Sequence, residues 1–243
     1  MHVGNGLGGI MKKLDFLWIG ILLALFAFIA YPATREMFIG FTTAHAYIGG
    51  FLKFAILATM GELLAIRLAK GDWVRPAGLG YRAIIWGFLG IVIVLIFAVF
   101  AGGVTAALSK GMLPFGGYAL TFAFSVSLIM NCTFAPTMMA FHKLTDTYID
   151  LKHANKGQKI KLERVVKTVD WNRFVSFVVL KTIPFFWIPA HTITFMLPPE
   201  YRVLMAAALS LALGLILSIK PKAVKTINSS KNNDKASTSY HKK

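Results

Sequence analysis

Three long runs of the sequence contain no charged residue, and they limit the folds that this chain can adopt. The runs cover residues 83–109, 111–141 and 203–219, and they are 27, 31 and 17 residues long. A helix needs ~20 apolar residues to cross the hydrocarbon core of a bilayer. Apolar residues also make up 56% of the 243-residue chain, above the roughly 45–50% of an average soluble domain. The sequence therefore predicts an all-α integral membrane protein and argues against a soluble globule.

Six segments within residues 14–219 have the length and composition of membrane spans. They lie near Leu14–Tyr31, His45–Leu68, Arg82–Leu108, Gly117–Phe141, Phe174–Phe195 and Tyr201–Ile219. With this assignment, 21 Lys and Arg lie on one side of the membrane and 3 lie on the other, namely Arg35, Lys110 and Arg202. Cytoplasmic loops carry the excess of basic residues. We therefore predict a polytopic six-helix bundle of the cell (inner) membrane, with both termini cytoplasmic.

Residues 1–13 form a short segment before the first span. Met11 is the expected start, because Lys12 and Lys13 lead directly into an apolar run. Gly4, Gly6 and Gly9 have the spacing of a dinucleotide-binding fingerprint, but no strand precedes them and we reject that interpretation. Residues 12–31 also resemble a secretory signal peptide. Tyr31-Pro32 stands where a small-residue cleavage site is needed, which favours a retained first helix.

The formal net charge of +16 would suggest nucleic-acid binding in a soluble protein. Here the basic loop 142–173 and the basic tail 220–243 adjoin apolar spans, so anionic lipid headgroups are the nearest partner. Neither segment has the interleaved aromatics of a nucleic-acid stacking platform, and no nucleic-acid partner is expected. We expect a disordered tail, because it has almost nothing to bury. Ile160, Leu162, Val165 and Val166 could form one face of a short amphipathic helix on the membrane, or lie in a solvated linker.

Little in the sequence points to catalysis. Cys132 is the one cysteine, so an internal disulfide framework and a multi-cysteine metal site are excluded. We find no paired carboxylates, no nucleophile beside a base and no metal-ligand spacing. The sequence predicts neither an enzyme nor a cofactor.

Polar residues inside the spans are the candidate functional residues. Glu62, Asn131, Lys181 and His191 are candidates to line a cavity, because ionisable groups cost ~2.5–3.5 kcal/mol each to insert and by default face the bundle interior. Glu62 and Lys181 have similar predicted depths, about 7–10 Å from the cytoplasmic ends of their spans. We therefore expect them to form an ion pair. The alternative for Glu62 is a role in helix packing alone.

Two of these polar residues, Lys53 and His191, have two interpretations each. Lys53 faces a deeper cavity or extends to the outer interface. His191 lines a pore and handles protons, or bonds a backbone carbonyl freed by Pro184 or Pro189. Asn131 is expected to bond another helix. Pro184 and Pro189 predict a kinked fifth span beside a cavity. Glycines that would permit close helix contact lie at 49, 50, 61, 87, 90, 102 and 103.

Two stretches resemble a known membrane-protein family. Trp187-x-Pro189-Ala190 is followed by Phe195, Pro198, Tyr201-Arg202-Val203 and Leu217-Ser218. Upstream stand Pro136, Phe141-His142-Lys143 and Asp146, and further upstream Gly61-Glu62 and Asp72-x-x-Arg75. This pattern is similar to the signature of the Mpv-seventeen and peroxisomal membrane protein twenty-two family, over residues 57–82 and 134–219. Thr194 replaces the Asn of the family pattern, Ala135 replaces a Gly, and Ile188 separates the usual Trp-Pro pair.

The resemblance implies a distant, bacterial member with extra spans between Arg82 and Pro136. It implies channel-like permeation of small solutes and no established enzyme activity. The residues that it singles out are Glu62, Pro136, Lys143, Asp146, Trp187, Pro189, Pro198 and Arg202. Each also has a structural account: Lys143 and Asp146 can form a local pair, and Arg202 can anchor to lipid phosphate or cap the break at Pro198-Pro199.

We therefore expect a pore or facilitator for a small solute. One alternative is a scaffold without transport, in which the buried polar groups only fix helix packing. The other is a membrane enzyme that acts on lipid through His191 or His142. The solute, the gate and the oligomeric state, including a homo-oligomer, are left open by the sequence.

Overall fold

The computed structural model describes residues 11–156 and 158–218, and it is all-helical over these ranges. Four helical segments are long and apolar enough to cross a membrane: Lys13–Ala30, Leu79–Ser109, Ala119–Ala154 and Trp171–Met196. The all-α membrane-protein prediction is confirmed at this level, and four of the six predicted spans have the expected length and composition. The predictions for residues 1–10, Ile219 and the tail 220–243 lie outside the described residues.

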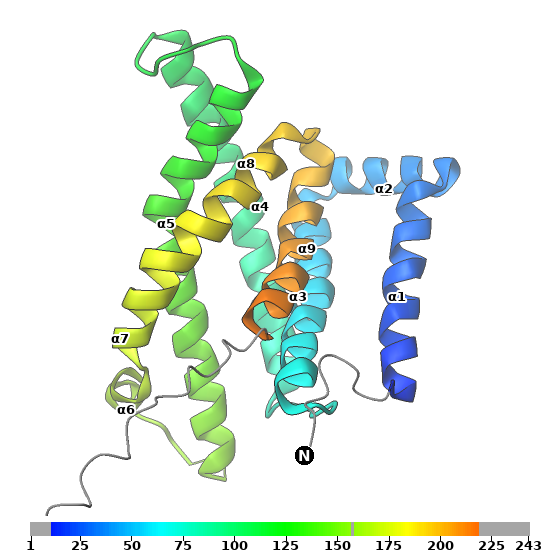
Figure 1. Ribbon diagram of the computed structural model, residues 1–243, viewed down its shortest axis with the longest axis vertical. Helices are drawn as coiled ribbons and strands as arrows, with labels where there is room; N and C mark the ends of the chain where they lie inside the picture. Colours follow the sequence, from blue (N-terminus) through cyan, green and yellow to red (C-terminus); the bar gives the residue numbers. More distant parts are fainter. Residues whose placement is uncertain (1–10, 157, 219–243) are drawn as a thin grey trace, which may run out of the picture.

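Most of the helices run roughly along the long axis of the molecule (Figure 1). In chain order they are α1 (Lys13–Ala30), α2 (Pro32–Ala44), α3 (Ala46–Lys70), α4 (Leu79–Ser109), α5 (Ala119–Ala154), α6 (Leu162–Thr168), α7 (Trp171–Arg173), the π-helix η1 (Phe174–Trp187), α8 (Ile188–Met196) and α9 (Pro199–Ser218). The first turn of α1 and the last turns of α3, α5 and α9 lie toward the lower end of Figure 1. We call this the basic end, because Lys13 starts α1 there and basic residues occupy the last turns of α3 (Arg67 and Lys70) and α5 (Lys152 and His153).

Helix α2 was not predicted, since residues 32–44 were expected to connect two spans. The segment forms a helix that crosses the upper end of the molecule (Figure 1). Pro32 starts it at a position where the missing N–H costs nothing. Arg35 and Glu36 are exposed, whereas Thr42 is buried. A helix of this mixed composition is suited to the membrane surface rather than the hydrocarbon core.

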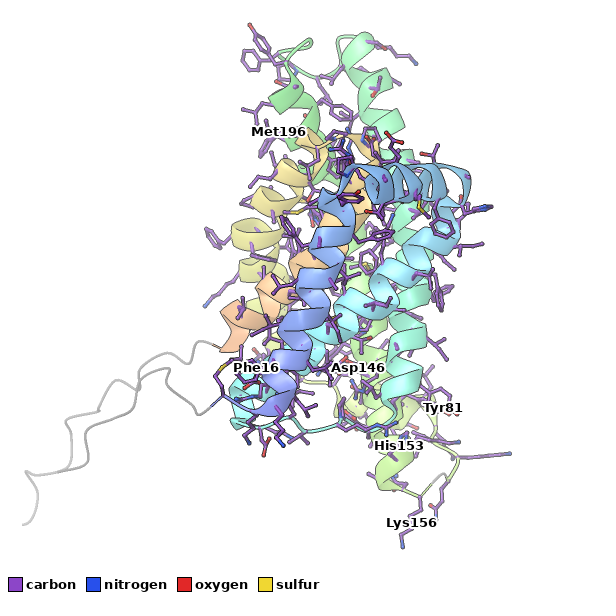
Figure 2. All side chains as sticks on the ribbon, turned by 90° about the vertical axis from the view of Figure 1, so that its right-hand side faces the viewer. Phe16, Tyr81, Asp146, His153, Lys156 and Met196 are labelled. Carbon is purple, nitrogen blue, oxygen red and sulfur yellow. The ribbon has the colours of Figure 1, made fainter. Side chains whose placement is uncertain are left out.

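Helix α5 extends well past the predicted end of its span at Phe141, and this corrects the predicted start of the basic loop. His142, Asp146 and Asp150 continue the helix at intervals of four residues, so they share one face of α5. Figure 2 shows Asp146, Tyr81, His153 and Lys156 in succession toward the basic end. Pro136 lies inside α5, and the helix continues through it.

Close glycine contacts join α3 to α4 and to α9. A Cβ atom on Gly50 would lie 2.8 Å from the carbonyl oxygen of Gly90, and one on Gly61 would lie 2.7 Å from that of Ser210. These backbones approach so closely because no side chain separates them. Gly102 and Gly103, which were expected to behave in the same way, have no atom within 4 Å of such a Cβ. The close-contact prediction is wrong for these two.

Helix α1 has no buried residue, although Leu22 and Leu25 pack partly buried against the core, and polar contacts also join it to the rest of the molecule. The guanidinium of Arg67 on α3 donates to both carboxylate oxygens of Asp15, at 2.9 and 2.8 Å. Trp73 Nε1 donates to Asp15 as well, at 2.7 Å. We call Asp15, Arg67 and Trp73 the α1 clasp. Trp18 Nε1 adds a bond to the carbonyl oxygen of Met60 at 3.3 Å.

The segment from α7 to α8 contains both prolines that predicted a kink. Pro184 lies inside η1, and Pro189 lies in the first turn of α8. The helix is continuous at Ile188, which has α-helical φ and ψ of −63° and −51°. The prolines are therefore accommodated by a widened helix that narrows into α8, and not by a gap.

Candidate functional site

A cavity of about 350 Å³ lies between α3, α4, α5, η1 and α9. Most of its walls are apolar, including Phe54, Phe97 and Met130. Three of the four predicted cavity residues line it: Glu62, Asn131 and His191. Lys181 does not line it, and its side chain is exposed on η1. We call this space the inner cavity.

Arg82 organises the end of the inner cavity nearest the basic end of the molecule. It is only 5% exposed, and its guanidinium contacts three carboxylates. Nη1 lies 2.9 Å from Glu62 Oε1 and 2.9 Å from Asp146 Oδ1. Nη2 lies 2.7 Å from Asp150 Oδ1. Nε donates to the carbonyl oxygen of Ala77 at 3.0 Å, so the group is satisfied on every side.

This ionic cluster corrects two predictions. Glu62 does not pair with Lys181, since its partner is Arg82. Lys143 and Asp146 do not form a local pair, since Asp146 contacts Arg82 and lies 3.5 Å from His142 Nε2. Lys143 lines the inner cavity instead. In both cases a cation on α4 lies closer to the carboxylate than the expected lysine.

Three nitrogen atoms in the wall of the inner cavity have no hydrogen-bond partner among the described residues. They are Nε1 of Trp86, Nδ1 of His142 and Nε1 of Trp187, and all three residues line the cavity. The His142 ring is held in place by Trp86, whose ring centroid lies 4.1 Å away. Buried polar atoms are nearly always paired in native proteins. These three nitrogens are therefore available to a bound molecule.

The middle of the bundle contains a polar bridge between α5 and α8. The amide of Asn131 and Nδ1 of His191 lie 3.1 Å apart, and Asn131 is fully buried. The Asn131 amide nitrogen also lies 2.8 Å from the carbonyl oxygen of Ser127. Trp187 stacks on the His191 ring with centroids 5.3 Å apart. The prediction that Asn131 bonds another helix is confirmed. His191 bonds a side chain and not a freed carbonyl.

Phe97 lies between the inner cavity and a second cavity of about 440 Å³ at the opposite end of the bundle. We call the second space the outer cavity, which Thr42, Lys53, Glu200 and Arg202 line. Phe97 lines both cavities, and it is 7% exposed. Its ring packs 4.8 Å from the Phe195 ring and 5.9 Å from the His191 ring.

Lys53 and Arg202 have defined roles at the outer end. Lys53 Nζ donates to Thr42 Oγ1 of α2 at 2.9 Å and lies 4.7 Å above the Phe38 ring, which favours the outer-interface interpretation of this lysine. Arg202 Nε donates to the carbonyl oxygen of Leu197 at 2.9 Å. Arg202 thereby caps the end of α8 before Pro198 and Pro199, one of its two predicted roles.

Arg82 and Asp150 are the site residues that the sequence did not reveal. Arg82 starts the third predicted span, and its charge was counted with the basic residues of the connection before that span. The spacing of His142, Asp146 and Asp150 gave the available signal, since a polar stripe on a helix requires a partner. No group of three or more His, Cys, Asp and Glu side chains suited to hold a metal ion occurs in residues 11–156 and 158–218.

Comparison with known proteins identifies no relative. No protein-family model, curated protein or solved structure matches the chain. A function for this chain therefore has to be inferred from the geometry of the two cavities.

Proposed function

We propose that this chain is a facilitator for a small polar solute, which passes between the inner and outer cavities when Phe97 moves aside. The observation that carries the proposal is the position of Phe97, since one aromatic ring lines both cavities. Pores that close with an apolar side chain exclude water and solute at that point. In this proposal, the pore is closed while the Phe97 ring lies between the two cavities.

The chemistry of the walls supports a small polar solute without net charge. Both signs of charge border each cavity: Glu62 and Lys143 line the inner one, and Glu200 and Arg202 line the outer one. A surface with both signs does not select strongly for a cation or an anion. The unpartnered nitrogens of His142 and Trp187 offer hydrogen bonds to such a solute.

The proposal includes six membrane spans, with α3 and α9 added to the four long apolar segments. Both helices run along the bundle axis in Figure 1 and pack against each other at Gly61 and Ser210. The polar residues of α3 are covered by protein, since Glu62 contacts Arg82 and Lys53 contacts Thr42. Such partners make a charged helix acceptable at membrane depth.

The excess of basic residues at one end supports an inner-membrane protein with both termini in the cytoplasm. Cys132 is the one natural cysteine, so a Cys132→Ala background permits a direct test. Single cysteines in Glu36→Cys and Arg75→Cys, at exposed positions on the two sides of α3, should react with an impermeant maleimide from opposite sides of the membrane. Reaction of both from the same side would contradict the six-span proposal.

Solute flux in proteoliposomes tests the facilitator proposal. We expect slow glycerol entry with the natural chain and faster entry with Phe97→Ala, measured by stopped-flow light scattering. Phe88→Ala is the matched control, since Phe88 lies on the same helix but is 50% exposed. Equal glycerol rates for Phe97→Ala, Phe88→Ala and empty liposomes would overturn the proposal and favour a scaffold.

A further inference from the structure

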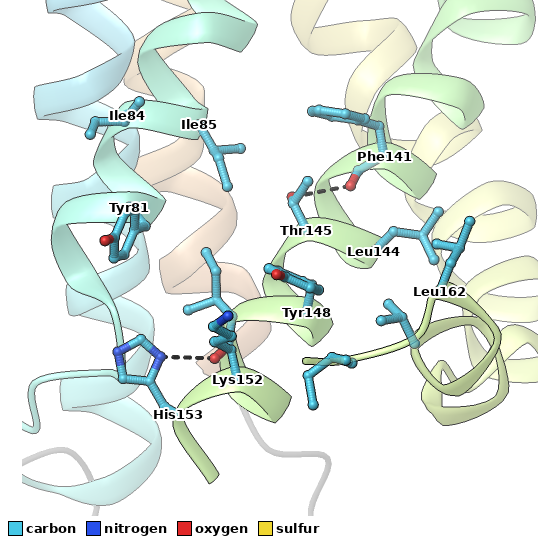
Figure 3. A pocket seen from close by; sticks show the side chains of 13 residues that line it. Tyr81, Ile84, Ile85, Phe141, Leu144, Thr145, Tyr148, Lys152, His153 and Leu162 are labelled. Atoms are coloured by element: carbon cyan, nitrogen blue, oxygen red, sulfur yellow. Dashed lines mark hydrogen bonds between the residues drawn. The ribbon is translucent and has the colours of Figure 1, made fainter. Parts of the chain in front are cut away.

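A separate groove of about 680 Å³ lies at the basic end of the molecule, between α4, α5 and α6 (Figure 3). It does not share a residue with the inner cavity, and it opens on the outside of the bundle between the exposed side chains of Tyr81 and Tyr148. The structure assigns this groove to one anionic phospholipid of the surrounding membrane.

One end of the groove is apolar, and it is the end that lies farther from the basic end of the molecule (Figure 3). Ile84 and Ile85 of α4 face Phe141 and Leu144 of α5 across it (Figure 3). Ile84 is 58% exposed and Phe141 is 41% exposed, although they lie beside the buried ionic cluster of Arg82. Large apolar side chains in such an open groove match the acyl chain of a lipid.

The other end of the groove is cationic. Lys152 lies between α4 and α5 below Tyr81 and Tyr148 (Figure 3). Lys152 makes no ion pair with the described residues. The distance along α5 from Phe141 to Lys152 is about 16 Å at the usual helical rise. This length matches part of an acyl chain below a lipid headgroup whose phosphate lies at Lys152.

The nearest acidic residues do not neutralise this end. Asp150 is bonded to Arg82 at 2.7 Å, and Glu163 is bonded to Lys167 at 2.5 Å. Lys161 precedes α6 and Arg164 lies within it, and both are exposed cations next in sequence to the groove residues Leu162 and Val165. An anionic headgroup is therefore favoured over a zwitterionic one. Tyrosines at the headgroup level, such as Tyr81 and Tyr148, are typical of a membrane interface.

Helix α6 closes the groove on the cytoplasmic side of the basic end. Val165 is buried at 1% exposed, whereas Leu162 is 71% exposed and lines the groove. Of the two interpretations left open for this region, the short helix is present over Leu162–Thr168, but Ile160 precedes it and the buried Val165 lines the groove. A lipid in the groove would therefore connect α6 to the bundle.

Native mass spectrometry of the full chain, released from mixed micelles, tests the assignment. With equal phosphatidylglycerol and phosphatidylcholine, we expect the first bound lipid to be phosphatidylglycerol. Lys152→Gln should reduce its retention about fivefold, the factor that one surface cation contributes to anionic-lipid binding. Lys70→Gln is the control, since Lys70 is an exposed cation at the end of α3, outside the groove.

A second variant separates the groove from charge alone. Leu144→Trp fills the apolar end, and we expect loss of both lipids with an unchanged melting temperature in detergent. Equal retention of the two lipids by the natural chain would overturn the assignment, as would equal effects of Lys152→Gln and Lys70→Gln. Retention of inorganic phosphate in place of lipid would show a simple anion site and overturn it too.

Discussion

The guanidinium of Arg82 on α4 lies 2.9 Å from the carboxylate of Glu62 on α3, and the same nitrogen lies 2.9 Å from Asp146 on α5. One buried cation thus joins three consecutive helices, α3, α4 and α5. Removal of one partner of a buried ion pair costs more than the pair itself contributes, because the remaining charge stays buried without a counterion.

We expect Arg82→Met to lower the free energy of unfolding by about 3–5 kcal/mol, because it leaves Glu62 and Asp146 facing each other. Asp150→Asn should cost at most about 1 kcal/mol, since its side chain is 62% exposed. Titration with sodium dodecyl sulfate in mixed micelles measures both. Arg75→Met removes an exposed cation and serves as the control. A cost for Arg82→Met as small as that for Arg75→Met would contradict a structural role for the cluster.

The α1 clasp should hold α1 against the bundle more strongly than the neighbouring surface pair does. Asp15 and Arg67 are each 12% exposed, whereas Lys12 and Asp72 are 41% and 59% exposed. Asp15→Asn should therefore increase hydrogen exchange throughout α1, and Asp72→Asn should leave it nearly unchanged. Mass spectrometry of peptides from α1 measures the difference. Equal exchange in the two variants would show that α1 is held by lipid and not by the clasp.

The Lys12–Asp72 pair also predicts a weak dependence on pH. The hydrogen bond from Lys12 lowers the pKa of the Asp72 carboxyl below its usual range. A lowered pKa in the folded state means that the pair stabilises the protein above the ordinary pKa of Asp, and that this contribution is lost as the pH falls through the lowered value. As the pH is lowered, the melting temperature of Asp72→Asn should therefore fall slightly less steeply than that of the natural chain. An identical fall in both proteins would show that the Lys12–Asp72 pair does not contribute to the loss of stability in acid.

The sequence predicted the long apolar helices because hydrophobicity and length are local properties of the chain. It did not predict which charges meet. Glu62 and Lys181 were matched by depth, but Lys181 lies on the exposed face of η1. Depth follows from counting residues, whereas the rotation of each helix depends on how its neighbours pack. The same limit explains why Arg82, at the edge of an apolar run, was counted as a loop residue.

Glycines show the same distinction between pattern and packing. Gly90 and Gly102 lie in equally apolar parts of α4, yet only Gly90 meets another backbone. Gly90→Val should therefore lower stability by about 1–3 kcal/mol through overpacking against α3. Gly102→Val should be tolerated, because nothing lies within 4 Å of the added Cβ. The same detergent titration compares them, and a large loss in Gly102→Val would contradict the open environment of that residue.

The polar bridge between Asn131 and His191 gives the last prediction. Asn131 is fully buried, and its amide bonds both His191 and the carbonyl of Ser127. Asn131→Ala leaves His191 Nδ1 buried without a partner, so we expect a loss of about 1–3 kcal/mol in the free energy of unfolding. Thr133→Val is the matched control on α5, since the exposed Thr133 hydroxyl bonds only its own helix at Ile129.

The bridge also packs beside Phe97, through the His191 ring that lies 5.9 Å from it. If His191 positions Phe97 between the two cavities, Asn131→Ala should raise glycerol entry into proteoliposomes as well as lower stability, whereas Thr133→Val should change neither. A destabilised Asn131→Ala protein with the natural rate of glycerol entry would limit the bridge to a structural role. Unchanged stability and unchanged entry together would show that Asn131 and His191 are not coupled in the folded protein.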